Sequence, residues 1–182
     1  MWRDEIDALD VAVYAAIASS PTPTFDRVLG ALSRAADGSK LWIGVAGLLA
    51  GGGRRSGRRA AANGLASIAM ASAVLNLGLK PLRARRRPDP RKHGVPVERL
   101  VPMPGSTSFP SGHAGSAFAF ASGVSRTLPK TGAALHWVAA LVAYSRVHTG
   151  VHYPTDVVVG ALLGGSLAPV ATGALTRWRA GR

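Results

Sequence analysis

The chain has 182 residues, and its 22 lysines and arginines outnumber 9 aspartates and glutamates, giving a net charge of +13. This length suits one domain, and an apolar content of 47% argues against a disordered chain. The chain has no cysteine, which excludes disulfides and thiolate metal sites. Its charges are bunched, so that residues 60–79 and 157–176 are both uncharged. Because roughly 20 apolar residues span a bilayer, this pattern argues against a simple cytosolic domain.

The first 38 residues carry acidic side chains among apolar ones, and Pro21 and Pro23 divide them into two short segments. Neither segment is long or apolar enough to be a clear membrane span. We therefore expect residues 1–38 to form two amphipathic helices that lie at the membrane interface. The alternative for the first helix is that residues 7–19 cross the bilayer as a short span.

Residues 39–176 are predicted to form a membrane-embedded, all-α bundle of about five transmembrane helices. Glycines such as Gly160 and Gly164 predict close contacts between these helices, and Pro169 predicts a kink in the last one. The four arginines between residues 54 and 59 are expected to form a tight turn, and residues 177–182 a basic tail. The expected helices are, in order, 41–53, 60–79, 111–126, 131–144 and 154–175.

Three polar clusters lie at the ends of the expected spans. If the five spans alternate in direction, the end of the second span, the start of the third and the junction of the fourth with the fifth all fall on one side of the membrane. The polar stretch 80–110, which joins the first two clusters, has the length of a functional or disordered loop. The clusters are Lys80 with Arg87, then Ser111-Gly112-His113, then Arg146 with His152 and Asp156.

These residue types suit a phosphate group. Lysine supplies charge, and arginine matches two phosphate oxygens with two N–H groups. A helix that begins at Ser111-Gly112 points free backbone N–H groups at an anion. Asp156, four residues after His152, can hold one imidazole nitrogen and leave the other as a nucleophile. Since His113 can donate a proton to a leaving oxygen, the set contains the parts required for phosphoryl transfer.

The order and spacing of these residues resemble the three-part signature of the type 2 phosphatidic acid phosphatase superfamily. The chain reads Lys80-x6-Arg87-Pro88, then Pro110-Ser111-Gly112-His113, then Ser145-Arg146-x5-His152-x3-Asp156, with no substitution at a signature position. The signature covers under half of the chain. The resemblance implies a phosphatase that acts on membrane lipids and needs neither a cofactor nor a metal.

The resemblance also implies a role for each residue. His152 would attack phosphorus and form a phosphohistidine, Asp156 would orient His152, and His113 would protonate the leaving group. The cations would neutralise charge that a metal neutralises in other phosphatases. The groups that would hold the phosphoryl oxygens are Lys80, Arg87, Ser111, the Gly112 amide and Arg146.

The expected substrate is a membrane lipid phosphate whose tail stays in the bilayer, and no nucleic-acid partner is expected. We favour a polyprenyl phosphate or diphosphate of a bacterial cell envelope. The alternatives are phosphatidate, phosphatidylglycerol phosphate and a prenylated sugar phosphate.

The distribution of basic residues predicts the orientation of the chain in the cell membrane. The loop 80–110 on the site side carries eight lysines and arginines, against nine on the opposite side. Because the site needs its own cations for phosphate, the remaining balance places the active site on the extracytoplasmic face. The nine are Arg54, Arg55, Arg58, Arg59, Arg126, Lys130, Arg177, Arg179 and Arg182.

Each element alone also has a structural interpretation. A Ser-Gly-His sequence before a helix is more often a cap than a site. Arg83, Arg85 and Arg86 are interpreted as headgroup contacts or a solvated face. The remaining histidines lie outside the signature. We interpret His93 as a loop residue and His136 as a residue at the membrane interface. For His148 two positions stay open, one in the wall of the pocket and one outside it.

Three rival functions follow from the same residues. The chain could be a basic membrane protein that binds anionic headgroups without catalysis. It could be a vanadate-dependent haloperoxidase, which shares a similar anion cage, although the uncharged spans argue against that class. It could also transport a lipid phosphate without hydrolysing it.

Overall fold

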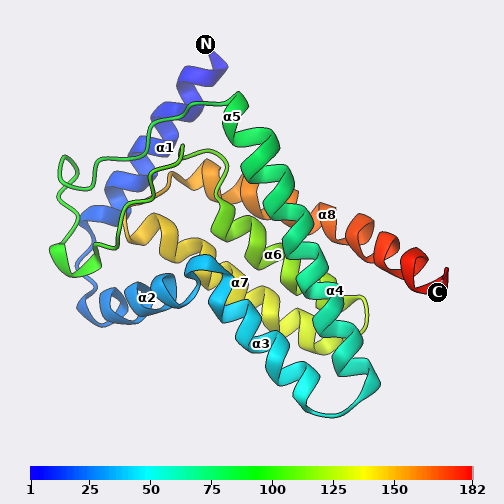
Figure 1. Cartoon of the computed structure of the whole chain (residues 1–182). Coiled ribbons are helices and arrows are strands. Elements are labelled where there is room, and N and C mark those ends of the chain that lie inside the picture. The colour runs from blue at the N-terminus through cyan, green and yellow to red at the C-terminus, as the bar shows by residue number, and fades with distance from the viewer. Residues whose placement is uncertain (182) are drawn as a thin grey trace.

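A computed structural model of the chain describes residues 1–181, without the side chain of Arg3, and this part contains helices and loops but no strand. Figure 1 shows an all-helical bundle in which the long loop, α1 and the end of α5 gather at one end. Arg182, the last residue of the expected basic tail, lies outside the described residues. The helices are α1 (Trp2–Ser19), α2 (Pro23–Ala35), α3 (Lys40–Gly51), α4 (Arg55–Ser72), α5 (Lys80–Leu82), α6 (Gly112–Ser125), α7 (Pro129–His148) and α8 (Pro154–Ala180).

The two N-terminal helices separate at the two prolines. Helix α1 ends at Ser19, and α2 begins at Pro23, because proline at the first helical position leaves no extra donor unpaired. Helix α1 packs on the rest of the chain through Tyr14 and Ala18, which are both buried. The prediction of two helices in this region is therefore confirmed, and their place at a membrane interface stays a prediction.

The expected tight turn of arginines is wrong. Helix α4 already begins at Arg55, and the chain reverses before it, at residues 52–54. Gly53 supplies the left-handed conformation for this reversal, with φ of 70°, while arginine is a good helix former. Gly57 allows α3 and α4 to approach, because a Cβ atom there would lie 2.2 Å from the Leu49 carbonyl oxygen.

Helix α4 continues without a break into α5, so that residues 55–82 form one helix, longer than the expected 60–79. Between them, residues Ala73–Leu79 form a wider, π-helical stretch. Such stretches are frequent at functional sites because they turn the side chains that follow. This one leads directly to Lys80, and Arg83 then leaves the helix in an extended conformation.

Helix α6 lies at the centre of the bundle, in contact with α4, α7 and α8. Its residues Ala114, Ala117, Phe120 and Val124 are fully buried. The ring of Phe120 packs against that of Trp42 from α3, with 5.4 Å between the ring centres. Burial of this face stabilises the bundle and fixes where the first turn of α6 lies.

The last two helices are longer than expected. Helix α7 extends to His148 and α8 to Ala180, so that Arg177 and Arg179 of the expected tail are helical. Helix α8 also continues through Pro169 as a single helix. Residues 55–82 and 154–180 are the two helices in the described part of the chain that are long and apolar enough to cross a membrane.

Candidate active site

A cavity of about 420 Å³ lies at the end of the bundle where the long loop crosses it. Five of the eight site residues expected from the sequence line this cavity, namely Lys80, Arg87, Gly112, His113 and His152. The other three do not line it, although Ser111, Arg146 and Asp156 are all buried. The remaining lining residues are Ala36, Gly38, Ser39, Ser72, Asn76, Pro104, Ser106 and Ser116.

His152 lies on the short turn between α7 and α8, and its side chain is 1% exposed. The turn is closed by backbone N–H groups of Val151 and His152, which both donate to the Arg146 carbonyl at 3.1 Å. Gly150 makes the turn possible, with φ of 77° and the Tyr14 hydroxyl 2.9 Å from where a Cβ atom would lie. The sequence thus fixes the position of this imidazole through local backbone geometry.

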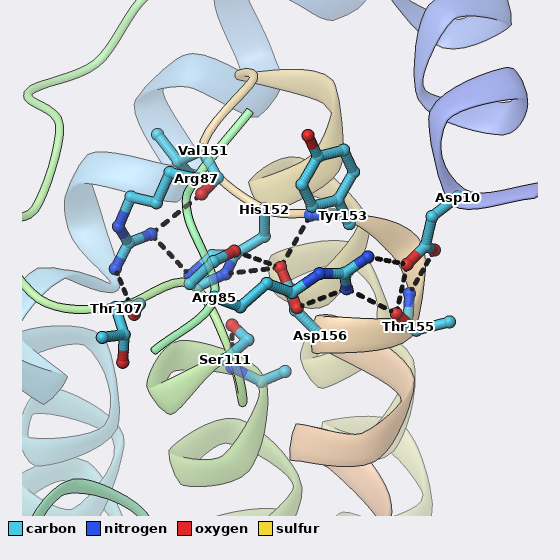
Figure 2. A network of polar contacts seen from close by, with 12 residues as sticks. Asp10, Arg85, Arg87, Thr107, Ser111, Val151, His152, Tyr153, Thr155 and Asp156 are labelled. Carbon is cyan, nitrogen blue, oxygen red and sulfur yellow. Dashed lines mark hydrogen bonds and ion pairs between the residues drawn. The ribbon is translucent and has the colours of Figure 1, made fainter. Parts of the chain in front are cut away.

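The imidazole of His152 lies between a cation and a carboxylate (Figure 2). Its Nε2 atom is 3.1 Å from an Arg87 nitrogen, and its Nδ1 atom is 3.4 Å from Oδ2 of Asp156. Because arginine can only donate, Nε2 carries the lone pair and the proton belongs on Nδ1, on the Asp156 side. This is the tautomer that a nucleophilic Nε2 requires.

Burial lowers the pKa of His152 to about 4. The neighbouring Asp156 opposes this shift, whereas the charge of Arg87 adds to it. Since an imidazole with this pKa is unprotonated at neutral pH, His152 is available as a nucleophile or base.

Asp156 lies in the first turn of α8 and is fully buried. Its Oδ2 atom accepts a hydrogen bond from the Tyr153 backbone N–H at 2.9 Å and another from the Ser108 hydroxyl. Its Oδ1 atom accepts from the Arg85 guanidinium at 2.9 Å. These three donors hold the carboxylate in place beside His152.

The guanidinium of Arg87 is oriented by backbone carbonyl groups. It donates to the carbonyls of Ser106 at 2.9 Å, Thr107 at 3.2 Å and Val151 at 2.8 Å. Lys80 lies nearby, and its Nζ atom donates to the Ser106 hydroxyl at 3.2 Å. The loop residue Ser106 therefore connects the two cations of the cavity wall.

The start of α6 forms the floor of the cavity. A Cβ atom at Gly112 would lie 3.4 Å from the Asn76 side-chain oxygen and 3.7 Å from Lys80 Nζ, so a larger residue would fill this space. Ser111 caps the helix, because its hydroxyl accepts from the Ala114 N–H at 3.5 Å. Its own N–H donates to the Asp156 carbonyl at 2.9 Å, which connects the first turns of α6 and α8.

Arg146 is 1% exposed and lies in the last turn of α7. One guanidinium nitrogen donates to the Ser33 hydroxyl at 2.5 Å and lies 3.6 Å from Oδ1 of Asp37. Its Nε atom is buried and has no hydrogen-bond partner among the described residues. This arginine is held beside the cavity with one donor left unpaired.

The sequence interpretation of Arg85 is wrong. Arg85 is 20% exposed and is not a headgroup contact, because it pairs with Asp7 and Asp10 of α1 at 2.7 Å and with Asp156 of α8 at 2.9 Å. It also stacks on the Tyr153 ring. The signal in the sequence was the pair of aspartates three residues apart on one face of α1, because such a pair is stabilised by a nearby cation.

A second acidic residue was missed. Asp37 was not among the expected site residues, but its Oδ1 atom lies 2.8 Å from His113 Nε2. The other three histidines do not line the cavity. His148 is buried against Asp26 at 2.9 Å, His136 hydrogen-bonds Ser122 at 3.1 Å, and His93 packs against the Tyr14 ring. Within the described part of the chain, no group of three or more His, Asp or Glu side chains could hold a metal ion.

The fold and the site together define an all-helical protein with a histidine–aspartate pair at the wall of a cationic cavity. The chain belongs to the PAP2 superfamily, whose family model matches residues 61–180. It is 38% identical over 157 residues to decaprenylphosphoryl-5-phosphoribose phosphatase of Mycolicibacterium smegmatis, covering 85% of this chain and 80% of that relative. It is also 46% identical over 74 residues to undecaprenyl-diphosphatase of Sulfolobus acidocaldarius, covering 38% of this chain and only 34% of that relative.

Solved structures share the fold along most of the chain. LpxE of Aquifex aeolicus matches with a TM-score of 0.72 at 25% identity, covering 90% of this chain and 94% of that one. A transmembrane PAP2-type phosphatidylglycerolphosphate phosphatase of Bacillus subtilis matches with a TM-score of 0.71 at 23% identity, covering 95% and 87%. The all-α fold expected from the sequence is thus confirmed.

Proposed function

We propose that the chain is a metal-independent lipid phosphate phosphatase that works through a phosphohistidine. The observation that carries this proposal is the buried His152, which lies between Asp156 and Arg87 at the wall of a cationic cavity. Because such a cavity neutralises a phosphoryl group with side-chain cations, it needs an anionic substrate.

In the first step, Nε2 of His152 attacks phosphorus and the bond to the ester oxygen breaks. The electron pair of that bond goes to the ester oxygen, which takes a proton from His113. Asp156, whose Oδ2 atom lies 3.4 Å from Nδ1, stabilises the imidazole as it gains positive charge. Arg87 releases Nε2 as the substrate enters and turns its donors toward the phosphoryl oxygens, beside Lys80 and the Gly112 N–H.

In the second step, water attacks the phosphohistidine and the N–P bond breaks. His113, which is now neutral, takes the proton of the water, and inorganic phosphate leaves. The unpaired Nε of Arg146 is a further donor for the phosphoryl group once the anion occupies the cavity. Two steps through a covalent intermediate replace one difficult displacement.

We propose a polyprenyl carrier phosphate as the substrate class. The two curated relatives are named for a decaprenylphosphoryl sugar phosphate and for undecaprenyl diphosphate. The cavity lies at the end of the bundle, where a phosphate at a membrane surface can enter while its lipid tail stays in the bilayer.

We also propose that the chain crosses the membrane several times. Apolar side chains project from the outer faces of several helices and are more than half exposed. An apolar surface of this extent is typical of a contact with lipid. The residues are Ile43 and Leu48 of α3, Leu77 of the π-helical stretch, Trp137 and Leu141 of α7, and Val158, Leu162 and Val170 of α8.

The proposed orientation places the cavity on the extracytoplasmic face. Arg55, Arg58 and Arg59 line a shallow depression together with Arg179 from the end of α8. This depression is remote from the cavity because it lies at the first turns of α4, more than twenty residues before Lys80. Since basic clusters stay on the cytoplasmic side, this end of the bundle faces the cytoplasm.

The test is phosphate release from purified protein in detergent with EDTA present. The panel is undecaprenyl phosphate and diphosphate, decaprenylphosphoryl-5-phosphoribose, phosphatidate and phosphatidylglycerol phosphate. We expect release from polyprenyl substrates, loss of release in His152→Asn and His113→Asn, and inhibition by vanadate. With labelled p-nitrophenyl phosphate, whose leaving group needs no proton, an acid-labile, base-stable labelled protein should accumulate in His113→Asn but not in His152→Asn. Loss of activity with EDTA, or full activity of His152→Asn, would refute the mechanism.

A further inference from the structure

Asp37 makes a contact that the proposed mechanism leaves unused. It lies on the turn between α2 and α3, and its Oδ1 atom is 2.8 Å from Nε2 of His113 at the start of α6. The same oxygen is 3.6 Å from a guanidinium nitrogen of Arg146. Because a carboxylate can only accept, Nε2 of His113 carries a proton in this contact.

The turn that carries Asp37 forms part of the cavity wall. Ala36, Gly38 and Ser39 all line the cavity, on either side of Asp37. Gly38 and Ser39 both have positive φ, 59° and 61°. A left-handed serine costs free energy that the surrounding structure must supply, so the turn is held in the conformation that presents Asp37 to His113.

Because His113 lies among cations, its protonated form depends on a nearby carboxylate more than that of an isolated histidine does. Lys80 and Arg87 line the same cavity, and Arg146 lies beside it. These positive charges oppose protonation of an imidazole, yet a general acid must carry a proton before it can donate one. Asp37 is the carboxylate that contacts His113 in the described part of the chain.

We propose that Asp37 is a positioning residue that orients His113 toward the leaving group and stabilises the protonated imidazole that donates to it. The two histidines that line the cavity then each have an aspartate behind them: Asp156 supports the nucleophile His152, and Asp37 supports the acid His113. As the P–O bond breaks, the proton on Nδ1 of His113 moves to the ester oxygen, while Nε2–H stays bonded to Asp37. This inference rests on the proposed function and adds one residue to it.

The proposal predicts a loss that depends on the leaving group. An alkoxide needs a proton when it leaves, whereas nitrophenolate leaves without one. We therefore expect Asp37→Asn to lower kcat/KM for hexadecyl phosphate by about 100-fold, and to change kcat/KM for p-nitrophenyl phosphate by less than about threefold. The parameter kcat/KM is used because it reports the first phosphoryl transfer and not the hydrolysis of the phosphohistidine.

A double mutant tests whether Asp37 acts through His113. His113→Asn should show the same selective loss, and Asp37→Asn added to His113→Asn should lower kcat/KM no further. Asp4→Asn, on an exposed carboxylate of α1, is the matched control and should keep wild-type kcat/KM for both substrates.

The outcomes separate this inference from the proposed function. Equal losses of Asp37→Asn on both phosphates, no loss on either, or a further loss in the double mutant would overturn the role of Asp37 while the wild type remains a phosphatase. A wild-type protein that releases phosphate from neither compound, or full activity in His152→Asn, would overturn the proposed function itself.

Discussion

Burial lowers the pKa of His152, and the lowered pKa makes the folded protein less stable at low pH. The folded chain holds the pKa of His152 at about 4, whereas an unfolded histidine has a pKa of about 6.5. Between these values the unfolded chain binds a proton that the folded chain does not. The free energy of unfolding is therefore complete above pH 6.5 and falls as the pH drops toward 4.

The first prediction follows from this difference. Wild-type protein should lose about 3 kcal/mol more stability than His152→Asn between pH 7 and pH 4. The measurement is thermal unfolding of both proteins in the same detergent over this pH range. Parallel stability curves for the two proteins would show that His152 titrates normally in the folded state.

The second prediction concerns Arg85, which contacts two carboxylates that are at most 1% exposed, Asp10 and Asp156. Arg85→Gln leaves both without their cation, so we expect a loss of about 3 kcal/mol in the free energy of unfolding, together with loss of activity. Arg83→Gln is the control, because Arg83 stacks on the Phe109 ring, and it should lose less than about 1 kcal/mol. Similar losses in both variants would contradict a special role for Arg85.

The residues found from the sequence and those missed differ in a physical way. Lys80, Arg87, His113 and His152 were found because their types and spacings indicate phosphate chemistry without knowledge of the fold. Asp37 was missed because its partner lies 76 residues away and no local pattern marks the contact.

At the scale of helices, the contact between α6 and α8 depends on glycine. A Cβ atom at Gly164 would lie 2.0 Å from the Gly115 carbonyl oxygen, and one at Gly160 would lie 2.4 Å from that of Ser111. Backbone atoms cannot swing aside as a side chain can. The two glycines therefore set the distance between the helices that carry Ser111 and Asp156.

The third prediction compares two glycines of α8. Gly164→Ala should lower the free energy of unfolding by about 1–3 kcal/mol and reduce activity, because it separates α8 from α6. A Cβ atom at Gly173 would meet no atom within 4 Å among the described residues, so Gly173→Ala should be neutral or raise stability by up to about 1 kcal/mol. Equal melting temperatures for the two variants would show that the helices do not depend on this close approach.

Helix positions followed from prolines more reliably than from charge. Pro154 begins α8 as expected, and the chain breaks between α1 and α2 at Pro21 and Pro23, as expected. The arginines at 55–59 were expected in a turn because they are charged, but they lie in the first turns of α4, where water and neighbouring phosphates can solvate them. Charge alone therefore did not mark the end of a helix.

At the scale of the molecule, the fourth prediction tests orientation. The chain has no cysteine, so a single introduced cysteine is the only thiol. Position 92 is exposed on the long loop, other residues of which line the cavity, and position 52 is exposed in the reversal between α3 and α4. The two variants are Lys92→Cys and Gly52→Cys. In intact cells, a membrane-impermeant maleimide should label the cysteine at 92, whereas that at 52 should react only after permeabilisation. The reverse pattern would place the cavity in the cytoplasm.

Arg85 and Arg87 are only two residues apart, yet their side chains lie on different sides of the long loop and line different cavities. Arg87 lines the cavity of His152, whereas Arg85 lines a separate hollow of about 430 Å³ beside α1 and α8. Figure 2 shows the two guanidinium groups reaching toward different partners. An insertion or deletion of one residue between them would move one arginine out of its site, whereas the exposed tip around residues 91–92 can change in length or accept a peptide tag without disturbing either.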